Sequence, residues 1–477
     1  MRYFSGSANF LTRRQMTACL LLAGTAPAIA PARANAQSRT DVRTAKAFTE
    51  ITAGPAKISP SGASSPPLSV LGYNGGTPGP ILRVTRGKQL SVRLKNGIAQ
   101  PTTIHWHGVR CPNDMDGVGG LTQAAVPPGG SFDYHFKPPD SGTFIYHAHA
   151  APFVSEQVYR GLAGVLVVDE EQPPDVDADM VLALSDWLLS ADRTLTLQRN
   201  GKVRTGITPP IDARLTINGK PVPQTKLLLA GSRARLRLAN LTASRLGGFV
   251  FSGSSPTVAS IDGQPCEPFI PGQNTMPAAP GTRIDVIVDL PREAGRHFTL
   301  SFIDWPAPGR IPRKPQELVS IATQGTALKQ RNAVTGLPRN LLLPELIRLQ
   351  DATRLDIVLT AGDSRQAAAG QLWAINRMQS GRAMAEPLFS VNAGAPVSLA
   401  FVNRTQFPHV MRVHGHSFRL LHNLDDGWDP YWLDTLVVRP GRTARIAFVA
   451  GKRGRWLISS GNLEYISQGL SAWFQVN

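Results

Sequence analysis

Two pairs of histidines, each pair separated by a single residue, could form a metal site. His105 and His107 form the first pair, and His147 and His149 form the second, both in strand-like surroundings. Residues i and i+2 of a strand point to the same face, so each pair would aim two imidazoles in one direction. Four converging imidazoles suit copper or zinc. The alternative is that the paired histidines lie on a solvent-exposed face without binding metal. The presence of two pairs in one domain favours the metal site over this alternative more than a single pair would.

A third histidine cluster lies far downstream, at His409, His414 and His416. Between the second and third clusters the sequence contains only His297, in an ordinary strand-like setting. A site built from all three clusters would therefore join the first and last parts of the chain. No local sequence motif could produce such an arrangement by itself.

These stretches resemble the copper-binding motifs of the multicopper oxidases. The resemblance rests on TIHWHG at 103–108, on YHAH at 146–149 and on the residues from Met115 to Gly129. The third cluster is similar to the family's His-Pro-x-His-x-His-Gly sequence. The resemblance implies three cupredoxin-like Greek-key β-sandwich domains and bound copper. It also implies an oxidoreductase that takes electrons from a small-molecule reductant and passes them to dioxygen.

The resemblance assigns five histidines to the family's three-copper cluster, at the interface between the first and third domains. The predicted metal ligands are His105 for type 2 copper, His107 and His147 for one type 3 copper, and His149 and His414 for the other. Three further cluster positions carry no histidine and are occupied by Arg412, Ser459 and Gly461.

Arg412 is the most consequential of these replacements. A guanidinium stays protonated and would repel nearby metal ions unless a carboxylate pairs with it. Asp116 is the candidate partner. Two alternatives follow: the remaining histidines bind a reduced set of copper ions, or they are relics in a metal-free interface.

The predicted type 1 site is more severely changed. Only His409 remains, because Ser460, Tyr465 and Leu470 stand where the family has Cys, His and Met. A lone imidazole does not hold copper there, and no thiolate remains to relay electrons. The resemblance therefore identifies a divergent family member without type 1 copper ligands.

An internal repeat indicates the elements that position these residues. Three segments run nine residues from a glycine to an asparagine with apolar alternation between, namely Gly87 to Asn96, Gly231 to Asn240 and Gly394 to Asn403. Each is followed by a Pro-Gly step, whose glycine is Gly129, Gly281 or Gly441. Another alternating strand begins after each of these steps. Alternation with a period of two predicts strands with one buried face, and Pro-Gly steps predict turns. Three copies of this plan predict an all-β protein with three sandwich domains.

The repeat suggests domain boundaries at 37–170, 171–326 and 351–477, with a linker at 327–350. Residues 1–36 read as a signal peptide, with the twin-arginine pair Arg13-Arg14 before a short apolar run and the cleavage sequence Ala34-Asn35-Ala36. A chance arginine pair in an ordinary secretory signal is the alternative. We expect an exported, periplasmic protein that does not span the membrane, because no apolar stretch reaches about 20 residues.

The charge and the cysteines bear on partners. Loss of the signal lowers the formal net charge from +17 to +13, which favours anionic envelope components as neighbours. The basic residues are scattered without interleaved aromatic residues, so we do not expect nucleic-acid binding. Cys111 and Cys266 remain after processing, and an oxidising compartment permits a disulfide between them.

A second resemblance suggests a non-catalytic alternative. Residues 156–164 and 370–377 are similar to segments of the FtsP-like (SufI-like) proteins, periplasmic relatives that have lost copper and support the cell-division machinery. Those relatives have also lost the first-domain histidines that this chain keeps. The sequence therefore leaves two functions open: a copper-binding oxidoreductase, or an envelope or cell-division scaffold without copper.

Overall fold

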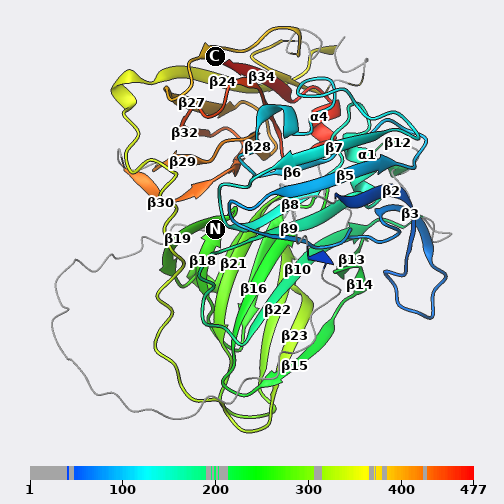
Figure 1. Ribbon diagram of the computed structural model, residues 1–477, viewed down its shortest axis with the longest axis vertical. Coiled ribbons are helices and arrows are strands. Elements are labelled where there is room, and N and C mark those ends of the chain that lie inside the picture. The colour runs from blue at the N-terminus through cyan, green and yellow to red at the C-terminus, as the bar shows by residue number, and fades with distance from the viewer. Residues whose placement is uncertain are drawn as a thin grey trace. The chain divides into compact units, whose positions relative to one another are not determined.

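The computed structural model describes residues 48–189, 213–305, 314–364, 372–378, 384–422 and 427–477, together with 40–41, 195, 198–199, 202–203 and 370. The predicted signal peptide at 1–36 lies outside the described residues, as does Gln371 of the second FtsP-like segment. Residues Ser38–Asn477 form one compact unit. Figure 1 shows that the described chain is built almost entirely of strands, which confirms the expected all-β class.

The internal repeat corresponds to two neighbouring strands of one sheet in each domain. The first strands of the repeat are β5 (Leu90–Asn96), β16 (Arg233–Asn240) and β27 (Pro396–Asn403), and the second are β7 (Ser131–Phe136), β21 (Arg283–Asp289) and β32 (Thr443–Val449). Each first strand pairs antiparallel with its second strand.

The glycines and asparagines of the repeat have a backbone role. All six repeat glycines have positive φ, between 64° and 86°, a conformation that disfavours other residues at these turns. Each repeat asparagine ends its strand with an Asx turn, in which the side-chain oxygen accepts the N–H two residues later. The side-chain amides of Asn96, Asn240 and Asn403 also donate to backbone carbonyls, at 2.7–3.1 Å.

The first sandwich contains a five-stranded sheet ordered β1-β4-β9-β8-β6 and a four-stranded sheet ordered β3-β2-β5-β7. Its remaining strands are β1 (Thr40–Asp41), β2 (Thr49–Ile58), β3 (Leu68–Tyr73), β4 (Leu82–Thr85), β6 (His105–His107), β8 (Gly142–His147) and β9 (Ala163–Asp169). Trp106 is fully buried in the core, with its ring edge-on to Tyr134 and Phe136.

The second sandwich contains a seven-stranded sheet ordered β14-β13-β10-β16-β21-β18-β19 and a five-stranded sheet ordered β15-β23-β22-β17-β20. Its remaining elements are β10 (Ala178–Trp187), β13 (Arg214–Ile217), β14 (Lys220–Pro221), β15 (Gln224–Leu229), β17 (Gly247–Ser252), β18 (Thr257–Ile261), β19 (Gln264–Phe269), η2 (Gly272–Asn274), β20 (Thr275–Ala278), β22 (His297–Asp304) and β23 (Gln316–Gln324). A separate ribbon pairs β11 (Gln198–Arg199) with β12 (Lys202–Val203).

The third sandwich contains a six-stranded sheet ordered β25-β24-β27-β32-β29-β30 and a five-stranded sheet ordered β26-β34-β33-β28-β31. Its remaining strands are β24 (Thr353–Ala361), β25 (Trp373–Ile375), β26 (Ser390–Val391), β28 (His409–Val413), β29 (Phe418–Leu421), β30 (Trp428–Leu433), β31 (Thr435–Val438), β33 (Gly454–Ser460) and β34 (Ser471–Val476).

Helical structure among the described residues is confined to short connections. Those that lie wholly within the described residues are η1 (Asn113–Met115), α1 (Val154–Tyr159), η3 (Leu349–Asp351) and α4 (Leu463–Ser467), besides η2. In the described part of the chain, no helix is long and apolar enough to cross a lipid bilayer. Cys111 and Cys266 are both buried free thiols, so the structure does not contain the disulfide that the sequence permitted.

Polar contacts between the sandwiches fix the interface at which the histidines meet. Arg235 of the second sandwich pairs with Glu170 at the end of the first, at 2.8 Å. Arg283 of the second donates to Asp434 of the third through Nη1, at 3.0 Å. The first and third sandwiches are joined by Asn113, whose side-chain amide donates to the carbonyl of Arg455 at 2.6 Å.

Candidate metal centre

The two histidine pairs of the first sandwich converge, as predicted. Strand β6 carries His105 and His107 and pairs antiparallel with β8, which places His105 directly opposite His147. His149 follows the end of β8. Neighbouring rings in this group lie 5.3–6.1 Å apart between centroids, and all four side chains are at most 3% exposed. The alternative of a solvent-exposed face is therefore wrong.

The structure brings His414 from the third sandwich into the same group. His414 follows β28, and its ring stacks on that of His105 with 4.2 Å between centroids. The ring of His149 lies 5.3 Å from that of His414 and meets it edge-on. All five residues predicted as metal ligands thus lie together at the contact between the first and third sandwiches, although their metal-binding role stays a prediction.

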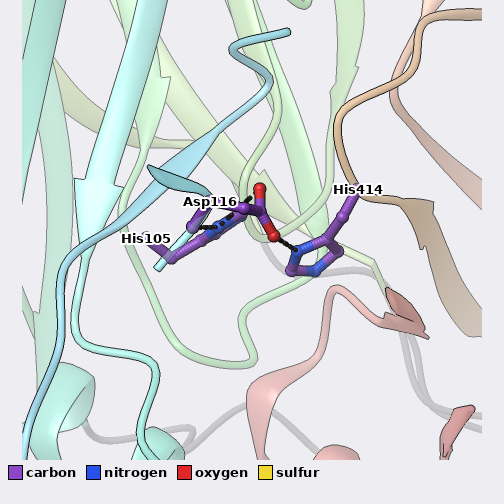
Figure 2. A group of neighbouring side chains, drawn as sticks. All are labelled: His105, Asp116 and His414. Carbon is purple, nitrogen blue, oxygen red and sulfur yellow. Dashed lines mark hydrogen bonds and ion pairs between the residues drawn. The ribbon is translucent and has the colours of Figure 1, made fainter. Parts of the chain in front are cut away.

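Asp116 holds two of these rings in place. As Figure 2 shows, it lies between His105 and His414. Its backbone carbonyl accepts from His105 Nδ1 at 2.6 Å, and its carboxylate accepts from His414 Nδ1 at 3.1 Å. Because each Nδ1 donates, Nε2 is the ring nitrogen that can offer a lone pair at either position. Burial alone would raise the pKa of Asp116, but His105 and His414 more than offset it and hold that pKa well below its usual range.

Four of the histidines are held in the neutral form that binds metals. Burial is the main cause of the lowered pKa values of His107, His147, His149 and His414, and Arg412 lowers all four further. Neighbouring imidazoles also lower the pKa values of His147, His149 and His414. The pKa of His414 falls to about 3. Neutral imidazoles need no deprotonation before they bind a cation, so these side chains are competent ligands near neutral pH.

Arg412 occupies the centre in a way that the sequence did not predict. Its Nη2 donates to His105 Nε2 at 2.9 Å, so the His105 lone pair that could bind a metal accepts from a guanidinium instead. No direct hydrogen bond or ion pair joins Arg412 to Asp116 among the described residues, and the proposed pairing of the two is therefore wrong. Burial lowers the pKa of Arg412 to about 10, which still leaves it charged at neutral pH.

The guanidinium is poorly satisfied. Arg412 is 2% exposed, and within the described chain its Nε and Nη1 have no hydrogen-bond partner. Gly461 lies beside both Arg412 and Val410: a Cβ at Gly461 would lie 2.6 Å from Val410 Cγ1, which is too close, and 3.4 Å from Arg412 Cδ, which is an ordinary van der Waals contact. A larger residue at 461 would therefore collide with Val410 rather than with Arg412.

The residues at the predicted type 1 positions pack as part of a hydrophobic core. Tyr465 and Leu470 belong to the third sandwich's core cluster, and the His409 ring lies edge-on to Trp373 and Tyr465, at 4.8 and 5.4 Å. His409 Nε2 is hydrogen-bonded to the Thr405 hydroxyl at 3.0 Å. Burial lowers the pKa of His409 to about 3.

Sequence reasoning missed the residues that orient His107. Its Nε2 lies 3.3 Å from the Thr435 hydroxyl and 3.4 Å from Asp434 Oδ1, which leaves Nδ1 available for a metal. Gly281 packs directly on this ring, since a Cβ there would lie 2.2 Å from His107 Cε1. No local signal marks Asp434 or Thr435 as partners of a histidine more than 300 positions earlier. The internal repeat predicted that Gly281 lies in a turn, but it did not indicate that Gly281 packs on the ring of His107.

Comparisons with known proteins agree with this geometry. Three family models, each described as multicopper oxidase, match residues 54–173, 178–316 and 350–477. Multicopper oxidase MmcO of Mycobacterium tuberculosis is 28% identical over 86% of this chain and 83% of its own length. Copper resistance protein A of Pseudomonas syringae pv. tomato is 40% identical over 136 residues, which are 27% of this chain and 22% of that protein.

Solved structures show the same architecture. A multicopper oxidase from Pseudomonas thermotolerans superposes with a TM-score of 0.77 at 28% identity, covering 92% of this chain and all of that one. Lac15 from a marine microbial metagenome superposes with a TM-score of 0.71 at 31% identity, covering 90% of this chain and all of that one. The prediction of three cupredoxin-like β-sandwiches is confirmed. The chain belongs to the multicopper oxidase family, whose fold and activity are those of copper-binding oxidoreductases.

Proposed function

We propose that this chain is a periplasmic copper-binding oxidoreductase with a degenerate type 1 site and a partial three-copper cluster. The observation that carries the proposal is the convergence of His107, His147, His149 and His414 as buried, neutral imidazoles. Export through the twin-arginine pathway, proposed from Arg13 and Arg14, would deliver the folded protein with its metal already bound.

The residues fit a pair of type 3 copper ions better than the full set. His149 Nε2 is buried with no partner among the described residues. The contacts of His107 with Thr435 and Asp434 use Nε2 and leave Nδ1, so lone pairs remain for metal ions. The type 2 position does not fit, since Arg412 uses the His105 lone pair. The type 1 position does not fit either, because Ser460, Tyr465 and Leu470 supply no thiolate, imidazole or thioether.

The protein's own residues would bind and orient the metals rather than relay electrons. Asp116 fixes the ring of His414, and Asp434 with Thr435 fixes that of His107. When bound, a copper pair supplies redox chemistry with dioxygen, and a small-molecule reductant would have to deliver electrons without a type 1 relay.

Copper analysis tests this proposal. Protein loaded with excess copper and then dialysed should retain about two ions per chain, because four imidazoles can supply two ligands to each. The double variant His147→Asn/His149→Asn should lose most of this copper. His135→Asn is the matched control, since His135 is exposed on β7 and should leave the copper content unchanged.

An FtsP-like envelope or cell-division scaffold is the second candidate. It is favoured by one observation, the buried guanidinium bonded to His105 where a metal would otherwise bind. Wild-type protein that retains no more copper than the double variant would support this scaffold and contradict the oxidoreductase.

A further inference from the structure

A cavity of about 520 Å³ has none of the five predicted copper ligands in its lining. Residues 340–347, here called the leucine segment, contribute Leu341, Leu342, Leu343 and Pro344 to its lining. The turn Gly415–Ser417 after β28 also lines the cavity, as do Trp432 and Trp456. This volume lies within the range of about 300–1,000 Å³ that small-molecule sites occupy.

The lining is mostly apolar. The three leucines, two prolines, Val449, Ala450 and two indole rings supply most of it. Its polar groups are largely satisfied by the protein: the Trp456 indole donates to the carbonyl of Lys452 at 2.7 Å, and both nitrogens of His416 are hydrogen-bonded. Burial raises the pKa of the Cys111 thiol well above its usual value, so it lines the cavity as a neutral group. A ligand would therefore gain mainly by burying a hydrophobic body.

The charges at the cavity have one sign. The lining contains Arg110 and Lys452 and no acidic residue. Arg110 is already neutralised by a bidentate pair with Asp140, at 2.6 and 2.7 Å. Lys452 is exposed and forms no ion pair with any described residue. One unneutralised ammonium beside an apolar cavity is complementary to a single negative charge on a hydrophobic molecule.

The leucine segment holds its wall in place without regular secondary structure. The Asn340 amide donates to Asp140 Oδ1 at 2.7 Å and to Gln264 Oε1 at 2.8 Å, and Leu343 is buried. Leu341 and Leu342 are nevertheless 84% and 58% exposed, although both line the cavity. These two side chains offer apolar surface that a ligand's hydrophobic tail would cover.

We propose that this cavity binds a hydrophobic carboxylate, with the tail between the leucine segment and Trp456 and the carboxylate beside the Lys452 ammonium. The inference is independent of copper and of the proposed function. Ligand binding at this cavity can therefore be refuted without refuting copper binding, and copper binding can be refuted without refuting ligand binding.

Binding of decanoate to the metal-free, full-length protein tests the proposal, measured by calorimetry and by indole fluorescence. We expect saturable binding at one site per chain, and weaker binding of the matched neutral probe decanol. From octanoate to decanoate the affinity should rise about fourfold for each methylene group added, and the rise should stop once the tail exceeds the cavity. Equal affinity for decanol, or no saturable binding of decanoate, would overturn the proposal.

Two surface variants separate the charge from general effects. Lys452→Glu should weaken decanoate binding about tenfold while leaving decanol unaffected, because it replaces an attraction by a repulsion. Arg453→Glu is the matched control, since the neighbouring Arg453 is also exposed but does not line the cavity. Equal losses in both variants would show a nonspecific charge effect and refute the site.

A third variant, Val449→Phe, narrows the cavity and tests where the ligand lies. It should reduce binding of both probes at an unchanged melting temperature, and full binding by a folded Val449→Phe protein would place the ligand elsewhere.

Discussion

Replacing Arg412 is the most informative change to the metal centre. Its guanidinium opposes copper in two ways, by its charge and by its hydrogen bond to His105 Nε2. The variant Arg412→His removes both and restores an imidazole. We therefore expect tighter copper binding, and little change in melting temperature because no carboxylate is hydrogen-bonded to Arg412 among the described residues.

The expected magnitude follows from Coulomb's law. Ring centroids in the cluster are 4.2–6.1 Å apart, so a guanidinium charge lies on this scale from any metal bound there. At about 6 Å and an effective dielectric constant of about 20, a unit charge repels a divalent ion by roughly 5 kcal/mol. Asp116 and Asp434 offset part of this, since both raise the pKa of Arg412. A gain of at least about tenfold in copper affinity, or about 1.4 kcal/mol, is a conservative expectation.

Two companion variants divide the effect. Arg412→Met removes the charge without adding a ligand, so its copper affinity should lie between those of wild type and Arg412→His. Arg412→Lys retains a cation and should bind copper no better than wild type. The assay is competitive copper titration with a thermal melt of each protein. The reasoning is refuted if Arg412→His and Arg412→Met gain no copper affinity, or if both lose about 3–5 kcal/mol of stability, as expected when one side of a buried ion pair is removed.

Three further predictions concern the third sandwich. Copper-loaded protein should show no intense thiolate-to-copper band in the visible region, because Ser460 replaces the cysteine; a blue protein would contradict the assignment of positions 460–470. Oxidation of phenolic dyes should be absent or very slow, because no thiolate relays electrons from the dye to the copper ions. Each additional 1.4 kcal/mol of activation barrier costs about tenfold in rate, and turnover at rates typical of the family would contradict this prediction. Because burial lowers the pKa of His409 to about 3 in the folded protein, its contribution to stability is present above about pH 6.5 and is lost as pH falls towards 3. In metal-free protein, His409→Gln should therefore reduce the slope of the free energy of unfolding against pH by up to about 1.4 kcal/mol per pH unit as the pH falls from about 6.5 towards 3. An unchanged slope would count against a neutral, buried His409.

The repeat was readable from the sequence because its physical causes are local. A positive φ at Gly87 and its five counterparts favours glycine, and an Asx turn at Asn96 requires an acceptor on that side chain. Strand alternation likewise depends on neighbours two residues apart. These local constraints indicated three sandwiches and placed the His-x-His pairs on common strand faces. The domain boundaries and the role of the five histidines in metal binding remain predictions.

Contacts across the interface were decided only by the tertiary structure. The sequence placed Arg412 near the cluster and suggested Asp116 as its partner, but the structure pairs Asp116 with His414 and Arg412 with His105. The cavity lined by the leucine segment could not be predicted from the sequence either, because residues far apart in the chain form it. Strand periodicity determines which face a side chain occupies, whereas its partner across an interface depends on how whole sandwiches pack. Residues hundreds of positions apart supply those partners, and no local spacing specifies the geometry between them.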